Sequence, residues 1–322
     1  QRERAESLLY ASQIESAKRA WEGGNAALAW KNLTSTSHDY RGWEYNYLNG
    51  LFNRNQTTLA GHDGAITCAA ISPDGTRIVS GGVDKSLKVW DLQTRRELFA
   101  LPQAASIHTV AFSPDGTRIV SGGEGSTLTL FDAMTGAELL TIEAHSHRVS
   151  SVAFSPDGQR ILSGGADGSA KVWETSTGQK LLTLAGHSRT VGSVAFSADG
   201  KLIVTGSLDN TARVWNADTG QEMLTLTGHL ERVTGVAFSA DSYRVATCSF
   251  DGIIRLWNVS TGREVRTLYG HSDRVLDVEF SRDGKSLLSA GTVGTLHIWD
   301  VATGQLTNSL LGHTGSVTSA TF

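Results

Sequence analysis

Histidine, serine or threonine, and aspartate recur together in this chain, and these are the residue types of a hydrolytic triad. Four such sets occur, each followed by a tryptophan: His62, Ser80, Asp84 and Trp90; His145, Ser163, Asp167 and Trp173; His187, Thr205, Asp209 and Trp215; and His229, Thr247, Asp251 and Trp257. An imidazole and a carboxylate could activate the hydroxyl as a nucleophile. An active site is normally built once, however, whereas these sets repeat, and each includes an indole N–H that needs a buried acceptor. The repetition therefore predicts structural networks and no catalytic residue.

Other chemical motifs are absent from the sequence. Gly284-Lys285-Ser286 resembles the end of a phosphate-binding loop, but Glu279 stands where the first glycine of that loop is required. The sequence contains no signature motif of zinc proteases, α/β-hydrolases or protein kinases. Cys68 and Cys248 lie far apart without neighbouring ligands, so both are expected to be small buried thiols. We expect no cofactor and no metal.

Composition and charge narrow the class of protein further. Of the 322 residues, 39% are hydrophobic and 19% charged, which favours a chain that folds around a core. The net charge of −4 gives no global attraction to nucleic acid, so none is expected as a partner. No apolar run approaches the roughly 18 residues that span a bilayer. We expect no membrane insertion by this segment, and a cytoplasmic location unless the parent chain carries an anchor.

The elements that position these residues repeat as well. Gly-His pairs or their remnants begin at positions 61, 144, 186, 228, 270 and 312, and aromatic-plus-acid or amide pairs begin at 90, 131, 173, 215, 257 and 299. In the third unit, Val149 to Ser155, Arg160 to Gly165 and Ala170 to Trp173 read as short strands separated by Pro-Asp-Gly and Asp-Gly turns. Lys180 to Leu184 reads as a fourth strand.

These motifs resemble the WD40 family, whose repeats of about 40 to 45 residues each build one propeller blade. The resemblance runs from about Gln56 to Phe322 and implies an all-β, WD40-like β-propeller with six complete repeats and a partial seventh blade. It also implies that the four sets are structural tetrads, hydrogen-bonded in series. Two units depart from the pattern and are expected to be looser: the second, with Gln103, Gly125 and Phe131, and the sixth, with Val293 in place of the aspartate.

We expect residues 1–55 to form a short helical extension and residues 56–322 to form the propeller. Tyr10, Ile14, Ala17 and Trp21 follow helical spacing, and two further helices are expected before residue 55. The segment resembles the helical linker before WD40 arrays in bacterial, planctomycete-type proteins and serine/threonine kinases. A tetratricopeptide-like hairpin on the propeller edge is an alternative, and both can hold.

The ends of the repeat array do not match each other. Gln56 to Ala60 reads as an outer strand and Ser316 to Phe322 as an innermost strand of one further blade whose middle strands are missing. We therefore expect a fragment that is truncated within blade seven.

A recurrent position on the propeller rim is the candidate binding site. Three residues after the histidine of their units stand Arg148, Arg232 and Arg274, and apolar Leu208 and Phe250 precede turn aspartates. Arginine and aromatic residues are enriched where interfaces carry their energy. The sequence thus favours a non-enzymatic scaffold that binds a protein or peptide, acidic in character, on its rim. The alternative is a regulatory or sensory propeller region of a larger multidomain serine/threonine kinase whose catalytic domain is absent.

Overall fold

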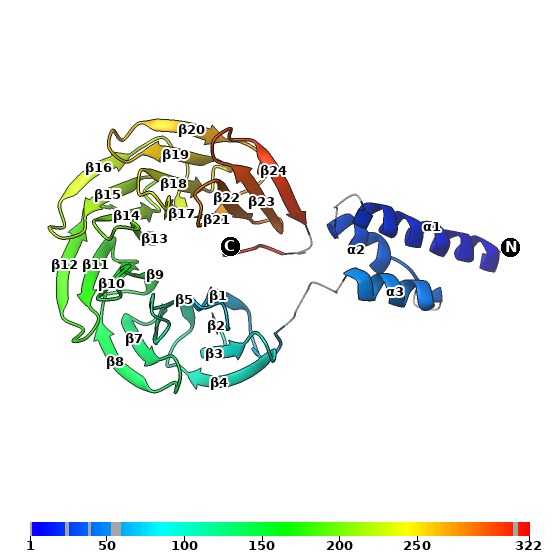
Figure 1. The fold of residues 1–322 in the computed structure, drawn as a ribbon, viewed down its shortest axis with the longest axis horizontal. Helices are drawn as coiled ribbons and strands as arrows, with labels where there is room; N and C mark the ends of the chain where they lie inside the picture. The colour runs from blue at the N-terminus through cyan, green and yellow to red at the C-terminus, as the bar shows by residue number, and fades with distance from the viewer. Residues whose placement is uncertain (1, 23–25, 38–39, 53–58, 312–314) are drawn as a thin grey trace.

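The computed structural model describes residues 2–22, 26–37, 40–52, 59–311 and 315–322. Six antiparallel sheets of four strands each are arranged as blades around a centre, which confirms the propeller (Figure 1). We name the blades A to F in chain order. Their strands are β1 (Ile66–Ile71), β2 (Arg77–Gly82), β3 (Ser86–Asp91) and β4 (Arg96–Pro102) in blade A; β5 (Ile107–Phe112), β6 (Arg118–Gly123), β7 (Thr127–Asp132) and β8 (Glu138–Glu143) in blade B; β9 (Val149–Phe154), β10 (Arg160–Gly165), β11 (Ser169–Glu174) and β12 (Lys180–Ala185) in blade C; β13 (Val191–Phe196), β14 (Leu202–Ser207), β15 (Ala212–Asn216) and β16 (Glu222–Leu226) in blade D; β17 (Val233–Phe238), β18 (Arg244–Ser249), β19 (Ile254–Asn258) and β20 (Glu264–Leu268) in blade E; and β21 (Val275–Phe280), β22 (Ser286–Gly291), β23 (Thr295–Asp300) and β24 (Leu306–Leu311) in blade F.

The turn chemistry explains why each blade begins with a tight hairpin. Between β9 and β10, the hydroxyl of Ser155 donates to Asp157 Oδ1 at 2.5 Å and accepts the backbone N–H of Arg160 at 2.9 Å. Gly158 completes the turn with φ at 69°, a conformation that glycine adopts without steric cost. Because the same turn recurs between the first two strands of every blade, the register of the hairpins is set locally.

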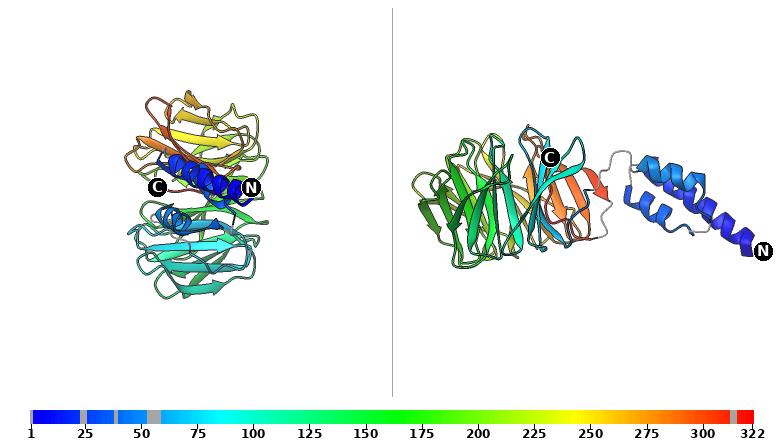
Figure 2. Two further views of the ribbon diagram at one scale, coloured as in Figure 1. Left: turned by 90° about the vertical axis from the view of Figure 1, so that its right-hand side faces the viewer. Right: turned by 90° about the horizontal axis from the view of Figure 1, so that it is seen from below.

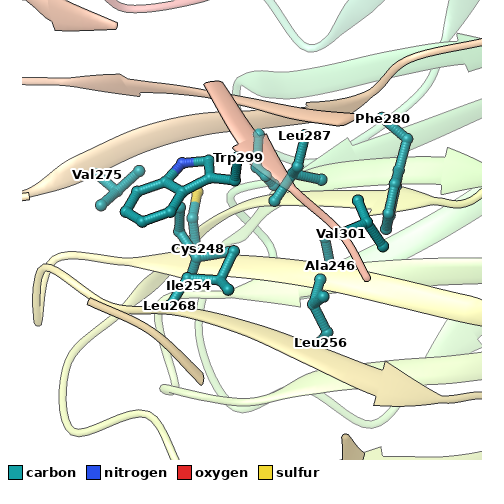
Figure 3. Packing of buried hydrophobic residues seen from close by; sticks show 11 residues of the cluster. Ala246, Cys248, Ile254, Leu256, Leu268, Val275, Phe280, Leu287, Trp299 and Val301 are labelled. Carbon is teal, nitrogen blue, oxygen red and sulfur yellow. The ribbon is translucent and has the colours of Figure 1, made fainter. Parts of the chain in front are cut away.

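The hydrophobic core lies between blades and not within them. One cluster joins Ala246, Cys248, Ile254, Leu256 and Leu268 of blade E to residues of blade F (Figure 3). The blade F side of this cluster consists of Val275, Val278, Phe280, Leu287, Trp299 and Val301. A sheet with two apolar faces is stable only when a neighbour covers each face, so blade stability is collective.

The ring of blades is open between β1 and β21, and residues 315–322 run into this opening (Figure 1). Ile66 and Ile71 of β1 are exposed as a result. Cys68 is only partly buried, contrary to the sequence-based expectation, although it packs against the core between blades A and B; Cys248, between blades E and F, is buried as expected.

Residues 316–322 do not form the innermost strand that the sequence predicts. The backbone N–H groups of Ala320 and Phe322 donate to the side-chain carboxylates of Asp277 and Glu279, at 3.1 and 3.0 Å. These bonds go to side chains of β21, and the described residues 315–322 are not part of any of the six sheets. Of the predicted outer strand at 56–60, residues 56–58 lie outside the described residues, and Leu59 and Ala60 are not in a strand.

Three helices precede the propeller and lie beside it (Figure 2), and α2 contacts β24. They are α1 (Arg2–Glu22), α2 (Ala26–Thr34) and α3 (Trp43–Phe52). Ala17, Ala29, Leu33 and Leu48 form a small buried cluster of their own, against which Ile14 packs. Within the described ranges, no helix is both long and apolar enough to cross a membrane.

Candidate functional site

The predicted tetrads come together in blades A, C, D and E. In blade D, the indole N–H of Trp215 donates to Thr205 Oγ1 at 2.9 Å, and His187 Nε2 lies 2.8 Å from the same oxygen. The other ring nitrogen, His187 Nδ1, lies 2.9 Å from Asp209 Oδ2. Since the tryptophan can only donate, the hydroxyl must donate to Nε2, and Nδ1–H must donate to the carboxylate. The corresponding bonds of blades A, C and E range from 2.7 to 3.0 Å.

This order of donors resembles a catalytic triad, but the hydroxyl is closed to a substrate. Thr205 and Ser163 have no exposed surface, and the imidazoles of His145 and His187 are 0% and 1% exposed. The oxygen already carries two hydrogen bonds inside the blade. The tetrad therefore joins the second and third strands to two turns, and the structure offers these four hydroxyls no path to a reactant.

Burial and hydrogen bonding shift the pKa values of the tetrad in one direction. Burial lowers the pKa of His145, His187 and His229, although the neighbouring aspartates oppose the shift. Burial alone would raise the pKa of Asp209, but hydrogen bonds from Thr211 and His187 outweigh it and hold the value at about 2. The folded protein thus keeps neutral imidazoles beside ionised carboxylates.

Blade F places beside its histidine a carboxylate that the sequence analysis missed. Asp273, two positions after His271, accepts hydrogen bonds from the hydroxyl of Thr292 at 2.9 Å and from Val293 N–H at 2.7 Å. Its second carboxylate oxygen lies 3.6 Å from His271 Nδ1. Asp273 therefore occupies the site that Val293 leaves without a carboxylate. The acidic residue next to the histidine pair was the signal in the sequence that could have revealed it.

Blade F also brings two imidazoles into contact. The ring centroids of His271 and His297 are 4.2 Å apart. Burial and the neighbouring His297 together lower the pKa of His271 to about 4. Among the described residues, no group of three or more histidine, cysteine, aspartate and glutamate side chains is arranged to hold a metal ion.

The rim arginines occupy equivalent backbone positions. The carbonyls of Arg148, Arg232 and Arg274 accept hydrogen bonds from the backbone N–H of Ala166, Phe250 and Thr292, at 3.0, 3.1 and 3.0 Å. Their different surroundings decide what each can do. Arg232 and Arg274 approach the same aromatic ring, that of Phe250, with their guanidinium carbons 4.0 and 4.8 Å from its centroid.

The other two rim candidates do not join this cluster. Arg148 lies two blades away on blade C, where its guanidinium is 3.8 Å from the carboxylate of Glu124. The same Glu124 oxygen lies 2.8 Å from His108 Nε2, a pair that the sequence analysis missed. Leu208 lies over Gly192 of its own blade D. The rim cluster is therefore defined by Arg232, Phe250 and Arg274.

Six four-stranded blades, interblade cores and repeated Trp-hydroxyl-His-Asp networks define a WD-repeat β-propeller. The family model "WD domain, G-beta repeat" matches residues 53–91, 96–132, 136–174, 178–216, 220–258 and 262–300. The chain belongs to the WD40 family.

Curated relatives match only short stretches of the chain. Small ribosomal subunit protein RACK1 of Glycine max is 40% identical over 55 residues, 17% of this chain and 17% of the relative. The Notchless protein homolog of Arabidopsis thaliana is 45% identical over 47 residues, 15% of this chain and 10% of the relative. Transcription factor unc-37 of Caenorhabditis elegans is 46% identical over 41 residues, which are 13% of this chain and 7% of the relative. The matched segments thus span a small part of each relative.

Proposed function

We propose that this propeller is a non-enzymatic scaffold that binds an acidic segment of a partner protein on its rim. The observation that carries the proposal is the Arg232, Phe250 and Arg274 cluster, in which two guanidinium groups flank one ring at 4.0 and 4.8 Å. Arginine and aromatic side chains dominate the energy of many protein interfaces. In this proposal residues 1–55 are a helical extension of the propeller, residues 56–322.

The charges of the cluster indicate the chemistry of the partner. Both arginine residues are exposed, and neither forms an ion pair with a carboxylate in the described part of the chain. Nearby Asp251 and Asp273 are turned into the blades, where they accept hydrogen bonds from Leu230 N–H and Val293 N–H. The ring of Phe250 holds both cations in place by cation–π contact, which reduces the entropy lost on binding. A carboxylate can then meet each guanidinium through two parallel hydrogen bonds.

Binding of acidic peptides tests the proposal directly. Fluorescence anisotropy with a labelled peptide rich in Asp and Glu should show saturable binding that weakens as salt is added, whereas a peptide of the amide residues Asn and Gln should not bind. Arg232→Lys should weaken binding measurably because an ammonium cannot form the bidentate contact. The double variant Arg232→Ala, Arg274→Ala should weaken it further without lowering the melting temperature.

Arg189→Ala is the matched control because it removes the same charge from an exposed arginine one blade away. Its effect should be much smaller than that of Arg232→Ala. If acidic peptides bind no better than neutral ones, or if the double variant binds as the parent does, the rim cluster does not bind acidic partners and the proposal is wrong.

A further inference from the structure

Blade B contains a cavity where the other blades contain a tetrad. It has a volume of about 350 Å³, and its wall includes Gln103, Ser121, Gly125, Thr129 and Glu138. We name this the blade B cavity. Gln103, Ser121 and Gly125 hold the positions of the tetrad histidine, hydroxyl and aspartate, and Phe131 holds that of the tryptophan. Its size falls at the lower end of small-ligand sites, roughly 300 to 1,000 Å³.

Loss of side-chain volume explains the cavity. Glycine replaces a carboxylate, phenylalanine replaces the larger indole, and the amide of Gln103 turns away to donate to the carbonyl of Pro102 at 3.0 Å. Part of the space that an imidazole and an indole fill in the other blades is therefore left open, although Phe131 is itself buried.

Blade B also lacks a basic side chain that other blades have at the same position. In blades A, D and E, a basic residue of the third strand pairs with a glutamate of the fourth: Lys88 Nζ with Glu97 at 2.8 Å, Arg213 with Glu222 at 2.5 Å and Arg255 with Glu264 at 2.6 Å. In blade B the basic position is Thr129, while the glutamate is retained as Glu138.

Two polar groups in the blade B cavity consequently lack the partners that their counterparts have. Glu138 accepts a hydrogen bond from the hydroxyl of Thr141 at 2.7 Å but forms no ion pair within the described residues, and it is the sole charged residue of the wall. Ser121 is 3% exposed, and its hydroxyl receives neither an indole N–H nor an imidazole. The equivalent hydroxyl of Thr205 has both. The Ser121 hydroxyl lines the cavity and is therefore free to accept a hydrogen bond from a ligand.

We infer that the blade B cavity binds an arginine side chain of a partner protein. Blades D and E show the arrangement within this same chain, because Arg213 and Arg255 each place a guanidinium on the equivalent glutamate, beside the tetrad indole. A guanidinium from outside supplies the cation that Thr129 cannot, and its several N–H donors can serve both Glu138 and Ser121. The site is opposite in charge to the Arg232, Phe250 and Arg274 cluster and does not depend on it.

The experiment uses NMR titration of the full chain with N-acetylarginine N-methylamide, which has no free charged termini. Chemical-shift changes should centre on the amides of Gly123, Gly125 and Thr129, with a millimolar Kd. The citrulline analogue is the neutral isostere, and it should bind at least about tenfold more weakly because it cannot form a charge-assisted bond with Glu138.

Two variants test the site from opposite directions. Glu138→Gln should weaken binding of the arginine probe by about tenfold or more. Glu143→Gln, on the same strand but outside the cavity wall, is the matched control and should bind as the parent does. Thr129→Arg should place an internal guanidinium on Glu138, abolish binding of the probe and raise the melting temperature.

The inference is overturned if the probe causes no shifts at the cavity, if citrulline binds equally well, or if Glu138→Gln leaves the affinity unchanged. Normal binding to Thr129→Arg would also contradict it. None of the rim arginines is altered in these variants, so failure of this inference is distinguishable from failure of the proposed acidic-peptide site.

Discussion

Asp273 Oδ1 lies 3.6 Å from His271 Nδ1, and this pair replaces the histidine–turn aspartate contact of the other tetrads. The carboxylate reaches the imidazole from the loop before β21, whereas Asp84, Asp167, Asp209 and Asp251 reach theirs from the turn between the second and third strands. Blade F therefore retains a carboxylate beside its histidine although its turn lacks one.

We expect Asp273→Ala to lower the stability of the protein by roughly 1 to 3 kcal/mol, because Val293 N–H and the Thr292 hydroxyl lose their acceptor. Glu231→Ala is the control, since Glu231 follows His229 at the same spacing in blade E but is exposed. Urea denaturation followed by tryptophan fluorescence measures both. Equal midpoints for the two variants would show that Asp273 does not replace the turn aspartate.

Removing the tetrad hydroxyl should have unequal effects in two blades. Ser163→Ala takes away an oxygen bonded to Trp173 and His145, and should cost roughly 1 to 3 kcal/mol because two buried polar groups lose a partner. Ser121→Ala makes the same change at the equivalent position of blade B, where no such bonds exist, and should be nearly neutral. Similar losses of stability for Ser163→Ala and Ser121→Ala in thermal denaturation would contradict this difference between the blades.

The stability of the propeller should fall in two stages as the pH is lowered. Burial lowers the pKa of the tetrad histidines, to about 4 for His271, so the unfolded chain binds protons first and stability declines below about pH 6.5. The pKa of Asp84 is about 2, where hydrogen bonds from His62 and Ser86 outweigh the effect of burial, so a second loss follows between about pH 4 and 2. Melting temperatures recorded from pH 8 to 2 test both stages. A flat curve from pH 8 to 5 would exclude the histidine stage.

Asp277, beneath residues 319–320, should show the opposite pH dependence. Burial raises its pKa, so its folded form favours the proton, and its contribution to stability is largest at low pH and is lost as the pH rises through the raised pKa. The melting temperature of Asp277→Asn relative to the parent should therefore increase from pH 3 to 8. For Asp300→Asn the relative value should decrease, since side-chain and backbone hydrogen bonds from Thr303 lower the pKa of that exposed carboxyl. If the relative melting temperatures of both variants changed with pH in the same direction, the raised pKa of Asp277 would be refuted.

The propeller and its tetrads could be predicted from the sequence because the interactions that define them recur. Ser155, Asp157 and Gly158 set a turn through contacts within a few residues. The fixed interval between His187 and Trp215 carries the signal of their network even though the bonds themselves are long-range. Because the pattern recurs along the chain, its strands and turns can be predicted without a structure.

What the sequence by itself determined is therefore the repeated unit: its four strands, its turns, and which side chains meet inside it. The tertiary structure alone decided which non-repeated side chains meet across units. It brings Arg232 and Arg274, from successive blades, onto one Phe250 ring, and leaves Arg148 beside Glu124. It also shows Asp273 replacing a turn residue and a cavity where Gln103 and Gly125 stand. These contacts depend on side-chain direction and on the volume left by neighbours, and neither is encoded in the spacing of residues along the chain.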